Sequence, residues 1–283
     1  MTFGEIFSNY TKELQAIYSK GEASAITHII FSHFAHLSKS ALAVSGNNIA
    51  DDITAAVLRE SLEKLLKHIP VQYITGEAWF YNLKFKVNDQ VLIPRPETEE
   101  LVQEVINFIK DTKGKTILDV GTGSGCIPIS IKKNIPDAEI ISLDISACAL
   151  HTAAKNAAAN HVDIDFRQID FLNEKTYHTL HVFDVIISNP PYIPENDKTT
   201  LDKNVMLHEP HLALFVPQND ALIFYRKIFL FAKEHLAEKG KIFLEVHEDY
   251  AKETAGIFNG DNYLTEIKKD MQGKERMVIV SKR

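Results

Sequence analysis

Apolar residues recur every three or four positions through the first 70 residues, which is the spacing of one face of a helix. Asp51 or Asp52 can cap the last of these stretches, and Pro70 follows its end. The pattern predicts three or four short helices that form a small bundle over residues 1–70. This region has no cluster of His, Asp or Glu that indicates catalysis. We interpret it as a substrate-docking domain, and an inert packing appendage is the alternative.

Between residues 71 and 94 the helical spacing gives way to short apolar runs beside Gly and Asn. Residues 73–76 and 80–85 are predicted to be short strands, so that 71–94 form a β-hairpin linker. Pro96 suits the first position of the next helix, where its missing N–H would have no partner in any case. A second domain is therefore expected over residues 95–283.

Strand and helix patterns alternate from Lys115 onward. Strands are predicted at 116–120, 138–143, 164–169, 183–188, 241–246, 263–268 and 276–281. Helices are predicted at 126–134, 146–160 and 219–237. This alternation indicates an α/β fold with a mostly parallel seven-stranded sheet covered on both faces, whose last two strands pair antiparallel. Residues 189–219 show little periodicity, and a loop of this length in a compact domain is usually functional.

The segment Ser188-Asn189-Pro190-Pro191-Tyr192 directly follows the β-branched run of the fourth strand. Neither proline can donate to a sheet ladder, and the residue before a proline is held out of the helical region. Asn189 is therefore expected at the carboxyl end of a strand, where ligands of open α/β sheets bind. Its oxygen and the Pro190 carbonyl are two acceptors that suit a planar –NH2 group, and the Tyr192 ring can stack on that group. A strand that ends in a proline turn with an asparagine cap is the alternative.

A glycine loop follows the first strand of the sheet and opens a helix: Asp119-Val120-Gly121-Thr122-Gly123-Ser124-Gly125-Cys126. Glycine allows a tight turn and the close approach of a ligand to the backbone. The dinucleotide fingerprint needs a third glycine where Cys126 stands, and the Gly-Lys-Ser/Thr of a phosphate loop does not follow. Asp119, two residues before the first glycine, favours an amino-bearing ligand over a pyrophosphate. A purely structural glycine turn is the alternative.

Acidic residues also follow the second and third strands. Asp144 ends the second strand at close to the spacing of about 20 residues that is typical of an acid that binds ribose hydroxyls. Asp170 and Phe171 follow the third strand, where a carboxylate can accept from an exocyclic amino group and a ring can pack on a base. The carboxyl ends of parallel strands meet at one edge, so these side chains are expected near Asn189. Singly, Asp144 or Asp170 would more often cap a helix or lie in a solvated turn.

Composition and charge narrow the function classes. The 283 residues are 45% hydrophobic and 24% charged, as in a globular protein, and the net charge of −7 weighs against broad nucleic-acid binding. Cys126 and Cys148 give neither a disulfide framework nor zinc-ligand spacing, so no metal site is expected. The chain shows no signal-peptide pattern and no apolar run of about 18 residues. We expect a cytoplasmic monomer without membrane association.

The motifs from Thr116 to Tyr192 resemble a class I S-adenosylmethionine-dependent methyltransferase, with Asn189-Pro190-Pro191-Tyr192 as its amino-methylating signature. Other segments narrow the resemblance to the HemK/PrmC family, whose members methylate the side-chain amide (N5) of the glutamine in the Gly-Gly-Gln motif of bacterial peptide chain release factors. These segments are 73–76, 93–99, Glu209-Pro210 with Ala213-Leu214, and Asp270 through Gly273 to Arg276. The resemblance covers nearly the whole chain and is weakest in residues 1–70.

The resemblance implies a Rossmann-like methyltransferase domain, S-adenosylmethionine as cofactor with S-adenosylhomocysteine as product, and release factors as protein partners. It implies catalytic roles for Asn189, Pro190 and Tyr192. It implies cofactor contacts from Asp119, Gly121, Thr122, Gly123, Gly125, Asp144, Ile145, Asp170, Phe171 and Asn189. It implies substrate contacts from Asn189, Pro190, Pro191, Tyr192, Arg95 and Glu209.

Two residues depart from the family pattern. His208 precedes Glu209 where an aromatic residue is usual, and His247 stands where glycine is more common. Both can alter the rim of the cofactor or substrate site.

Four other functions compete with this interpretation. One is glutamine methylation of a ribosomal protein, and another is methylation of N6 of adenine or N2 of guanine in a flipped or unpaired base. A binding module that senses S-adenosylmethionine without transfer is disfavoured by the complete Asn-Pro-Pro-Tyr signature. A nicotinamide dehydrogenase is disfavoured by Cys126 in the glycine loop. The preferred release factor and the way in which residues 1–70 bind it do not follow from the sequence.

Overall fold

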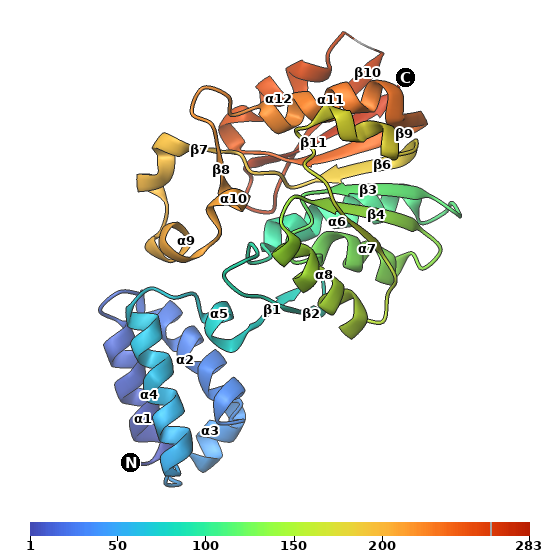
Figure 1. Cartoon of the computed structure of the whole chain (residues 1–283). Helices are drawn as coiled ribbons and strands as arrows, with labels where there is room; N and C mark the ends of the chain where they lie inside the picture. Colours follow the sequence, from blue (N-terminus) through green and yellow to red (C-terminus); the bar gives the residue numbers. More distant parts are fainter. Residues whose placement is uncertain (261) are drawn as a thin grey trace. The chain divides into compact units, whose positions relative to one another are not determined.

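The computed structural model describes residues 1–260 and 262–283 (Figure 1). The chain forms two compact units. The helical unit comprises Met1–Gly76 and Asp202–His208, and the sheet unit comprises Glu77–Leu201 and Glu209–Arg283. No helix in the described part of the chain has the length and apolar character needed to cross a membrane.

Four helices build most of the helical unit: α1 (Phe3–Leu14), α2 (Lys20–Phe34), α3 (Lys39–Ser45) and α4 (Asp52–Leu66). Thr2 caps α1 in a reciprocal pair of bonds with Glu5, and Asp51 caps α4 by accepting from the N–H of Thr54 at 2.9 Å. The apolar faces meet in a core that includes Tyr10, Leu14, Ile30, Phe31 and Leu58. The predicted helices and the predicted cap at Asp51 are confirmed.

The strand predicted at 73–76 is wrong, because Val71–Thr75 form helix α5. Pro70 stands immediately before this helix, and Gly76 ends it with a left-handed backbone at φ 71°. Periodicity alone cannot assign so short an apolar run, and the flanking proline and glycine are the signals that favour a helical turn.

A hairpin of two strands, β1 (Glu77–Phe80) and β2 (Leu83–Lys86), follows α5 and belongs to the sheet unit. Tyr81 and Asn82 form its turn with φ values of 49° and 59°. A two-residue turn with positive φ at both positions matches the twist of an antiparallel pair. A hairpin within residues 71–94 is therefore confirmed, but its strands differ from the predicted 73–76 and 80–85, and the turn lies inside the predicted second strand.

Seven strands form the main sheet, in the order β10-β11-β9-β6-β3-β4-β5. They are β3 (Thr116–Val120), β4 (Glu139–Asp144), β5 (Asp165–Gln168), β6 (Phe183–Ser188), β9 (Leu236–Glu245), β10 (Tyr263–Lys269) and β11 (Glu275–Lys282). The first five pair in parallel, whereas β11 is antiparallel to both β9 and β10. This confirms the predicted mostly parallel sheet with an antiparallel end.

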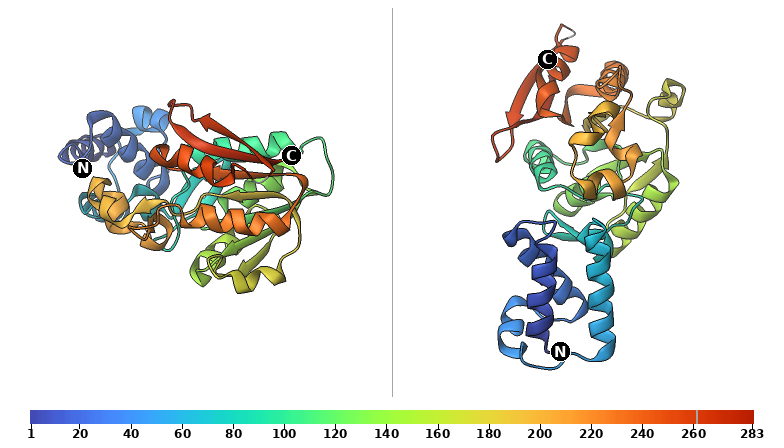
Figure 2. Two further views of the ribbon diagram at one scale, coloured as in Figure 1. Left: turned by 90° about the horizontal axis from the view of Figure 1, so that it is seen from above. Right: turned by 90° about the vertical axis from the view of Figure 1, so that its left-hand side faces the viewer.

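Helices cover both faces of this sheet (Figures 1 and 2). One face packs on α6 (Pro96–Ile109), α7 (Cys126–Asn134) and α8 (Ala147–Ala159), and the other on α11 (Ile223–His235) and α12 (Ala251–Phe258). Successive residues of a strand point to opposite faces. Accordingly Ile117 packs in the core on the side of α6, α7 and α8, whereas Leu118 packs in the core on the side of α11 and α12. Burial on both sides explains why the central strands β3 and β6 are mostly apolar in sequence.

The strand order places β3 between β4 and β6, so the chain moves outward from β3 in both directions. The carboxyl ends of these strands meet at the point where the order reverses, and open α/β sheets bind ligands there. Shorter elements complete the sheet unit: η1 (Glu174–Thr179), η2 (Glu195–Thr200), α10 (His211–Leu214) and η3 (Glu248–Tyr250).

The segment after Asn189 leaves the sheet unit and returns to it. Strands β7 (Ile193–Pro194) and β8 (Phe215–Val216) pair in parallel and close the two ends of this excursion. Its middle contains α9 (Lys203–His208), which belongs to the helical unit. There a ring nitrogen of His208 donates to the Lys67 carbonyl at 2.9 Å. The excursion explains why the sequence of this segment shows no single period.

Candidate active site

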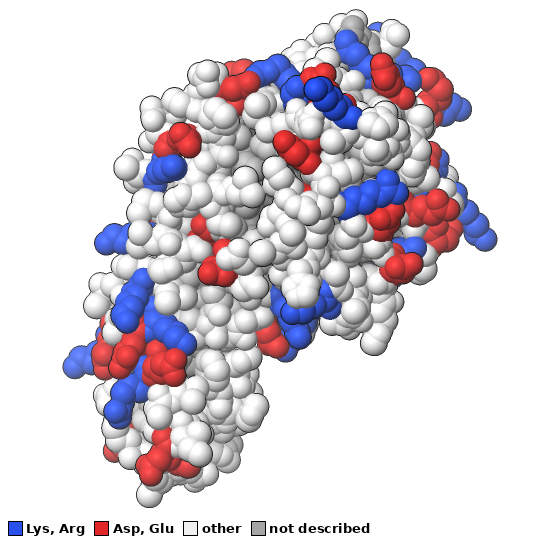
Figure 3. Space-filling view, viewed as in Figure 1, with Lys and Arg blue, Asp and Glu red and all other residues white. Residues whose placement is uncertain are grey.

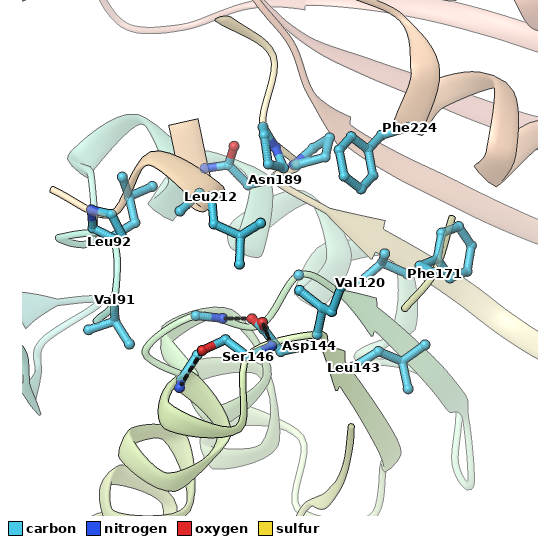
Figure 4. A pocket seen from close by; sticks show the side chains of 18 of the residues that line it. Val91, Leu92, Val120, Leu143, Asp144, Ser146, Phe171, Asn189, Leu212 and Phe224 are labelled. Carbon is cyan, nitrogen blue, oxygen red and sulfur yellow. Dashed lines mark hydrogen bonds between the residues drawn. The ribbon is translucent and has the colours of Figure 1, made fainter. Parts of the chain in front are cut away.

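A cavity of about 460 Å³ lies at the carboxyl ends of β3, β4 and β6 (Figure 4). Its size is within the range of small-ligand and cofactor sites. Nine residues singled out in the sequence line it: Gly121, Gly123, Asp144, Ile145, Asp170, Phe171, Asn189, Pro190 and Pro191. Figure 4 shows Asp144 and Asn189 on opposite sides of the cavity in this view. The structure therefore brings the strand-end residues together, as their positions after the strands predicted.

Asp144 is held in place through backbone N–H groups. Its Oδ2 atom accepts from Gly123 at 2.9 Å and its Oδ1 atom from Ser146 at 2.8 Å (Figure 4). Each carboxylate oxygen has a second lone pair that remains for a ligand hydroxyl. Burial raises the pKa of Asp144, although these backbone hydrogen bonds favour its charged form. The arrangement suits a pair of adjacent hydroxyl groups, such as those of a ribose.

The glycines of the loop have two different functions: some shape the cavity wall, and one allows close helix packing. Gly123 has φ 54°, and its N–H points at Asp144, so this glycine shapes the wall of the cavity. Gly125 does not line the cavity: a Cβ atom there would lie 2.9 Å from Ile129 and 3.1 Å from Ala153. Gly125 is thus required for the close packing of α7 and α8. It is not among the residues that line the cavity, and its contact with a cofactor stays a prediction.

Asp119 and Thr122 also lie outside the cavity wall, in the interior. Asp119 is fully buried, and the Ser142 hydroxyl donates to its Oδ2 atom at 2.5 Å. Burial raises the pKa of Asp119 to about 7, and the Ser142 hydrogen bond lowers it in part. Its Oδ1 atom is buried without a hydrogen-bond partner among the described residues. The structure therefore shows Asp119 bonded to Ser142 on β4, with one buried oxygen unpaired in the described part of the chain, and its contact with a cofactor stays a prediction.

Asp170 and Phe171 line the cavity in different ways. Asp170 is exposed, and its Oδ1 atom accepts from the N–H of Leu172 at 3.0 Å. Phe171 is only 4% exposed, with its ring centroid 5.1 Å from that of Tyr177 and 5.4 Å from that of Phe231. The Phe171 ring is therefore fixed by the core and offers only a small part of its surface to a ligand.

Asn189 is oriented by two buried residues, Thr98 and Glu245, that the sequence interpretation did not place among the site residues. Its Nδ2 atom donates to the Thr98 hydroxyl at 3.2 Å, and Thr98 donates to Glu245 at 2.6 Å. The Asn189 Oδ1 atom accepts no hydrogen bond from any described residue, so it is available to a ligand. Glu245 ends β9 as Asp144 ends β4, so its position in the sequence could have indicated a site residue. Thr98 lies in segment 93–99, which carries part of the family resemblance, but nothing in that segment pairs it with Asn189, because its partners are distant in sequence.

Tyr192 lies beside the cavity and not in its wall. Its ring packs against the core on the α11 face and lies 5.9 Å from the His247 ring. Burial and the nearby Glu245 carboxylate raise the pKa of Tyr192, so the phenol stays neutral at physiological pH. His247, one of the two departures from the family pattern, accepts from the N–H of Asp249 at 3.2 Å. Stacking of Tyr192 on a substrate amide remains a prediction.

Arg95 and Glu209, both predicted to contact substrate, are paired with each other. Arg95 Nη2 lies 2.5 Å from Glu209 Oε1, and Glu209 Oε2 accepts from the N–H of Ile93 at 3.2 Å. Glu209 is buried, whereas the Arg95 side chain is 31% exposed. The pair joins the segment before α6 to the segment that leads into α10, which includes the cavity residues Pro210 and His211.

Arg95→Ala is expected to lower the free energy of unfolding by about 2–3 kcal/mol. Loss of one partner leaves a buried charge and typically costs about 3–5 kcal/mol in a fully buried pair, and partial exposure of Arg95 reduces that cost. Calorimetric unfolding measures it, with Lys84→Ala as control, because the Lys84–Glu77 pair is exposed and worth less than about 1 kcal/mol. Equal losses in both variants would contradict a structural role for the Arg95–Glu209 pair.

Other parts of the wall had no signal in the sequence. They are Asp89, Gln90, Val91, Leu92, Leu212 and Phe224. These residues come from loops and a helix start whose local patterns give no indication of the cavity. Among the described residues, no group of three or more His, Cys, Asp or Glu is arranged to hold a metal ion.

Comparisons with known proteins agree with this geometry. The family described as "Methyltransferase small domain" matches residues 100–215, and "PrmC N-terminal domain" matches residues 5–76. The release factor glutamine methyltransferase of Flavobacterium psychrophilum is 41% identical over 278 residues, which cover 97% of each chain. That of Bacteroides thetaiotaomicron is 36% identical over 272 residues, covering 96% of this chain and 97% of the relative.

A solved structure shares the fold. The methyltransferase from Pyrococcus furiosus aligns with a TM-score of 0.50 and 15% identity, over 82% of this chain and 98% of that one. At this identity the likeness concerns the fold alone, which is the class I methyltransferase architecture described above. The full-length identity to the bacterial relatives is more specific: this chain belongs to the family of release factor glutamine methyltransferases.

Proposed function

We propose that the chain transfers a methyl group from S-adenosylmethionine to the side-chain amide nitrogen of the Gly-Gly-Gln glutamine of bacterial peptide chain release factors. The observation that carries this proposal is the Asn189 amide. It stands at the end of β6 in the wall of the cavity, with its oxygen free and with Pro190 directly after it. Relatives that align over nearly the whole chain are named for this activity.

The cavity fits S-adenosylmethionine by the chemistry of its wall. Asp144 offers carboxylate oxygens to ribose hydroxyls, and the bare backbone of Gly121 and Gly123 leaves room beside it. Apolar side chains make the remaining wall suitable for a base: Val120, Leu143, Ile145 and Phe171. When bound, the cofactor supplies a sulfonium-activated methyl group, and the protein contributes position and electrostatics.

The acceptor needs more help from the protein, because the lone pair of an amide nitrogen is delocalised into its carbonyl. The Asn189 oxygen and the Pro190 carbonyl are proposed to accept the two N–H groups of the glutamine side chain. These contacts turn its nitrogen lone pair toward the methyl group. They strengthen as positive charge develops on that nitrogen, which is preferential binding of the transition state. No general base is required, since solvent can accept the proton after transfer.

A protein substrate fits the surface better than a nucleic acid does. On the face shown in Figure 3, Lys and Arg are interspersed with Asp and Glu and form no continuous basic stripe. The net charge of −7 points the same way. We further propose a cytoplasmic monomer whose residues 1–70 dock the release factor while residues 95–283 carry the chemistry.

The test is methyl transfer from labelled S-adenosylmethionine to four acceptors. These are purified release factor, the same factor with its Gly-Gly-Gln glutamine replaced, a ribosomal protein and plasmid DNA. Label on the factor that disappears with the glutamine is the expected result. Label on the ribosomal protein alone, or on nucleic acid alone, would overturn the assignment of substrate. Cofactor binding without any transfer would favour a sensor.

Docking by the helical unit predicts a second kinetic result. Val44, Ile49 and Ile53 of the helical unit are 86%, 79% and 79% exposed, and burial of apolar side chains is the main driving force of most protein association. Replacing all three with Ser should raise the KM for intact release factor about tenfold, at unchanged kcat, if each loses part of its burial on binding. A short Gly-Gly-Gln peptide is the control substrate, and its kinetics should not change. An unchanged KM for the intact factor would contradict docking through these three residues.

A further inference from the structure

We propose that Thr98 and Glu245 are positioning residues that fix which end of the Asn189 amide is offered to the substrate. The inference rests on the proposed function of Asn189 as an acceptor for the glutamine –NH2 group. It concerns two residues that act through Asn189 and are not themselves part of the cavity wall.

The three residues come from three elements far apart in sequence. Thr98 is in the first turn of α6, Asn189 follows β6, and Glu245 ends β9. The hydrogen bonds run from Asn189 Nδ2 to Thr98 Oγ1 at 3.2 Å and from Thr98 Oγ1 to Glu245 Oε2 at 2.6 Å. Thr98 is 2% exposed and Glu245 4% exposed, so water does not compete for these groups.

The direction of the two hydrogen bonds follows from which groups carry a proton to donate. An ionised Glu245 carboxylate can only accept, so the single hydroxyl proton of Thr98 is used there. Thr98 then has only lone pairs left, and it needs a donor on the Asn189 side. The –NH2 end of Asn189 is the donor, which leaves Oδ1 as the end without a protein partner. Through Thr98, the negative charge of Glu245 thus orients the Asn189 amide with its oxygen toward the cavity.

A reversed Asn189 amide would place its oxygen against the lone pairs of Thr98. That arrangement loses one buried hydrogen bond and leaves acceptors facing each other. The preference for the productive orientation is therefore about tenfold or more. Without Thr98, an –NH2 group would face the substrate –NH2 group in a substantial fraction of molecules, and donors cannot pair with donors.

The ionisation of Glu245 has a direct consequence for the relay. Burial raises the pKa of Glu245 to about 7, while its hydrogen bond to Thr98 lowers it. A protonated Glu245 can donate to Thr98, and Thr98 can then donate to the Asn189 oxygen, which removes the constraint on the amide. The charged form is present above the pKa, so the orienting effect is complete at alkaline pH and is lost as pH falls through about 7.

Several other groups face Glu245 and contribute to its charge state. Arg276 on β11 and Arg95 before α6 lower its pKa, whereas Glu97 in the first turn of α6 raises it. Tyr192 lies close enough to feel the Glu245 charge, and Tyr225 on α11 donates to the Glu245 backbone carbonyl at 3.1 Å. Both phenols have raised pKa values because of burial and stay neutral in this range. Glu245 is therefore the group of this cluster whose titration reaches Asn189 through Thr98.

The first experiment compares Thr98→Val with Thr98→Ser in methyl transfer to release factor. Thr98→Val keeps the shape and removes the hydroxyl, so both amide orientations become populated and the Asn189 amide is no longer held at a fixed position. We expect the two effects together to lower kcat about tenfold with KM for the cofactor unchanged. Thr98→Ser keeps the hydroxyl and should stay within about threefold of wild type. Thr254→Val is the matched control, because Thr254 is buried in α12 and its hydroxyl has no hydrogen-bond partner among the described residues.

A second measurement needs no turnover and covers the case in which Thr98→Val fails to fold. The side-chain amide resonances of Asn189, identified by their loss in Asn189→Ala, should shift with a midpoint near pH 7 in the enzyme alone. The same titration should lower the wild-type kcat as pH falls below about 7. Glu245→Gln cannot titrate, so it should abolish both the shift of the resonances and this fall in kcat. A Thr98→Val enzyme with the kcat of wild type, a Thr98→Ser enzyme as impaired as Thr98→Val, or a midpoint unchanged in Glu245→Gln would overturn the proposal. Failure of wild-type enzyme to methylate release factor would instead overturn the proposed function.

Discussion

Asn189→Ala should lower kcat for release factor methylation on the order of 10²–10³-fold, the cost of removing one preorganised hydrogen-bonding group that acts in the transition state. The side chain stands in the cavity wall with a free oxygen, and alanine leaves the substrate –NH2 without that acceptor. The dissociation constant of S-adenosylmethionine should change by less than about threefold, because Asp144 and the glycine loop are untouched. Single-turnover rates and calorimetric titration of the cofactor measure the two quantities separately.

The matched control is Asn196→Ala in the same excursion. Asn196 is exposed, and it uses its backbone N–H, not its side chain, to donate to Gln218 at 2.9 Å. Its kcat should equal that of wild type. An Asn189→Ala enzyme with near-wild-type turnover would show that the amide nitrogen is activated in some other way.

Asp144→Ala should have the opposite effect, a loss of cofactor affinity of about 10²-fold with kcat at saturating cofactor within about threefold. Hydrogen bonds to a charged group contribute about 1.5–3 kcal/mol, so the loss of the ribose contacts alone accounts for this magnitude. Alanine also leaves the N–H groups of Gly123 and Ser146 without their acceptor, which loosens the wall of the cavity. Calorimetric titration with S-adenosylmethionine and with S-adenosylhomocysteine measures the change.

Asp163→Ala serves as the control for charge, because Asp163 is an exposed acid of the same unit that does not line the cavity. Asp144→Asn should fall between wild type and Asp144→Ala, since it keeps one acceptor oxygen and loses the charge. If Asp144→Ala reduced kcat and left affinity intact, Asp144 would belong to the chemistry and not to cofactor binding.

The sheet and the positions of its strand-end residues could be predicted because both depend on local patterns. Doubly buried strands are continuously apolar, and a polar residue directly after such a strand has only one edge of the sheet to occupy. Asp144, Asp170 and Asn189 therefore meet in the structure as expected. The helix at Val71–Thr75 was missed because its apolar run is too short for its period to be recognised.

What the sequence could not indicate is which polar residues are paired with each other. Thr98 and Glu245 meet through folding alone, and neither residue has a neighbour in sequence that hints at the other. The same holds for Arg95 and Glu209, which form an ion pair with each other; the substrate contacts expected of them stay predictions. Gly125 shows the reverse case, a motif residue whose observed environment is packing between helices.

The return of residues 202–208 to the helical unit has a consequence for folding during synthesis. Domains that are continuous in sequence can fold as soon as they leave the ribosome, at about 5–20 residues per second. Here the last piece of the N-terminal unit, Asp202–His208, is made only after the glycine loop and the Asn189 strand have been synthesised. The bundle is therefore without α9 for about ten seconds, although α9 contributes none of its described residues to the bundle core. Pulse-labelled nascent chains stalled before and after His208 should differ in protease resistance of the first 76 residues.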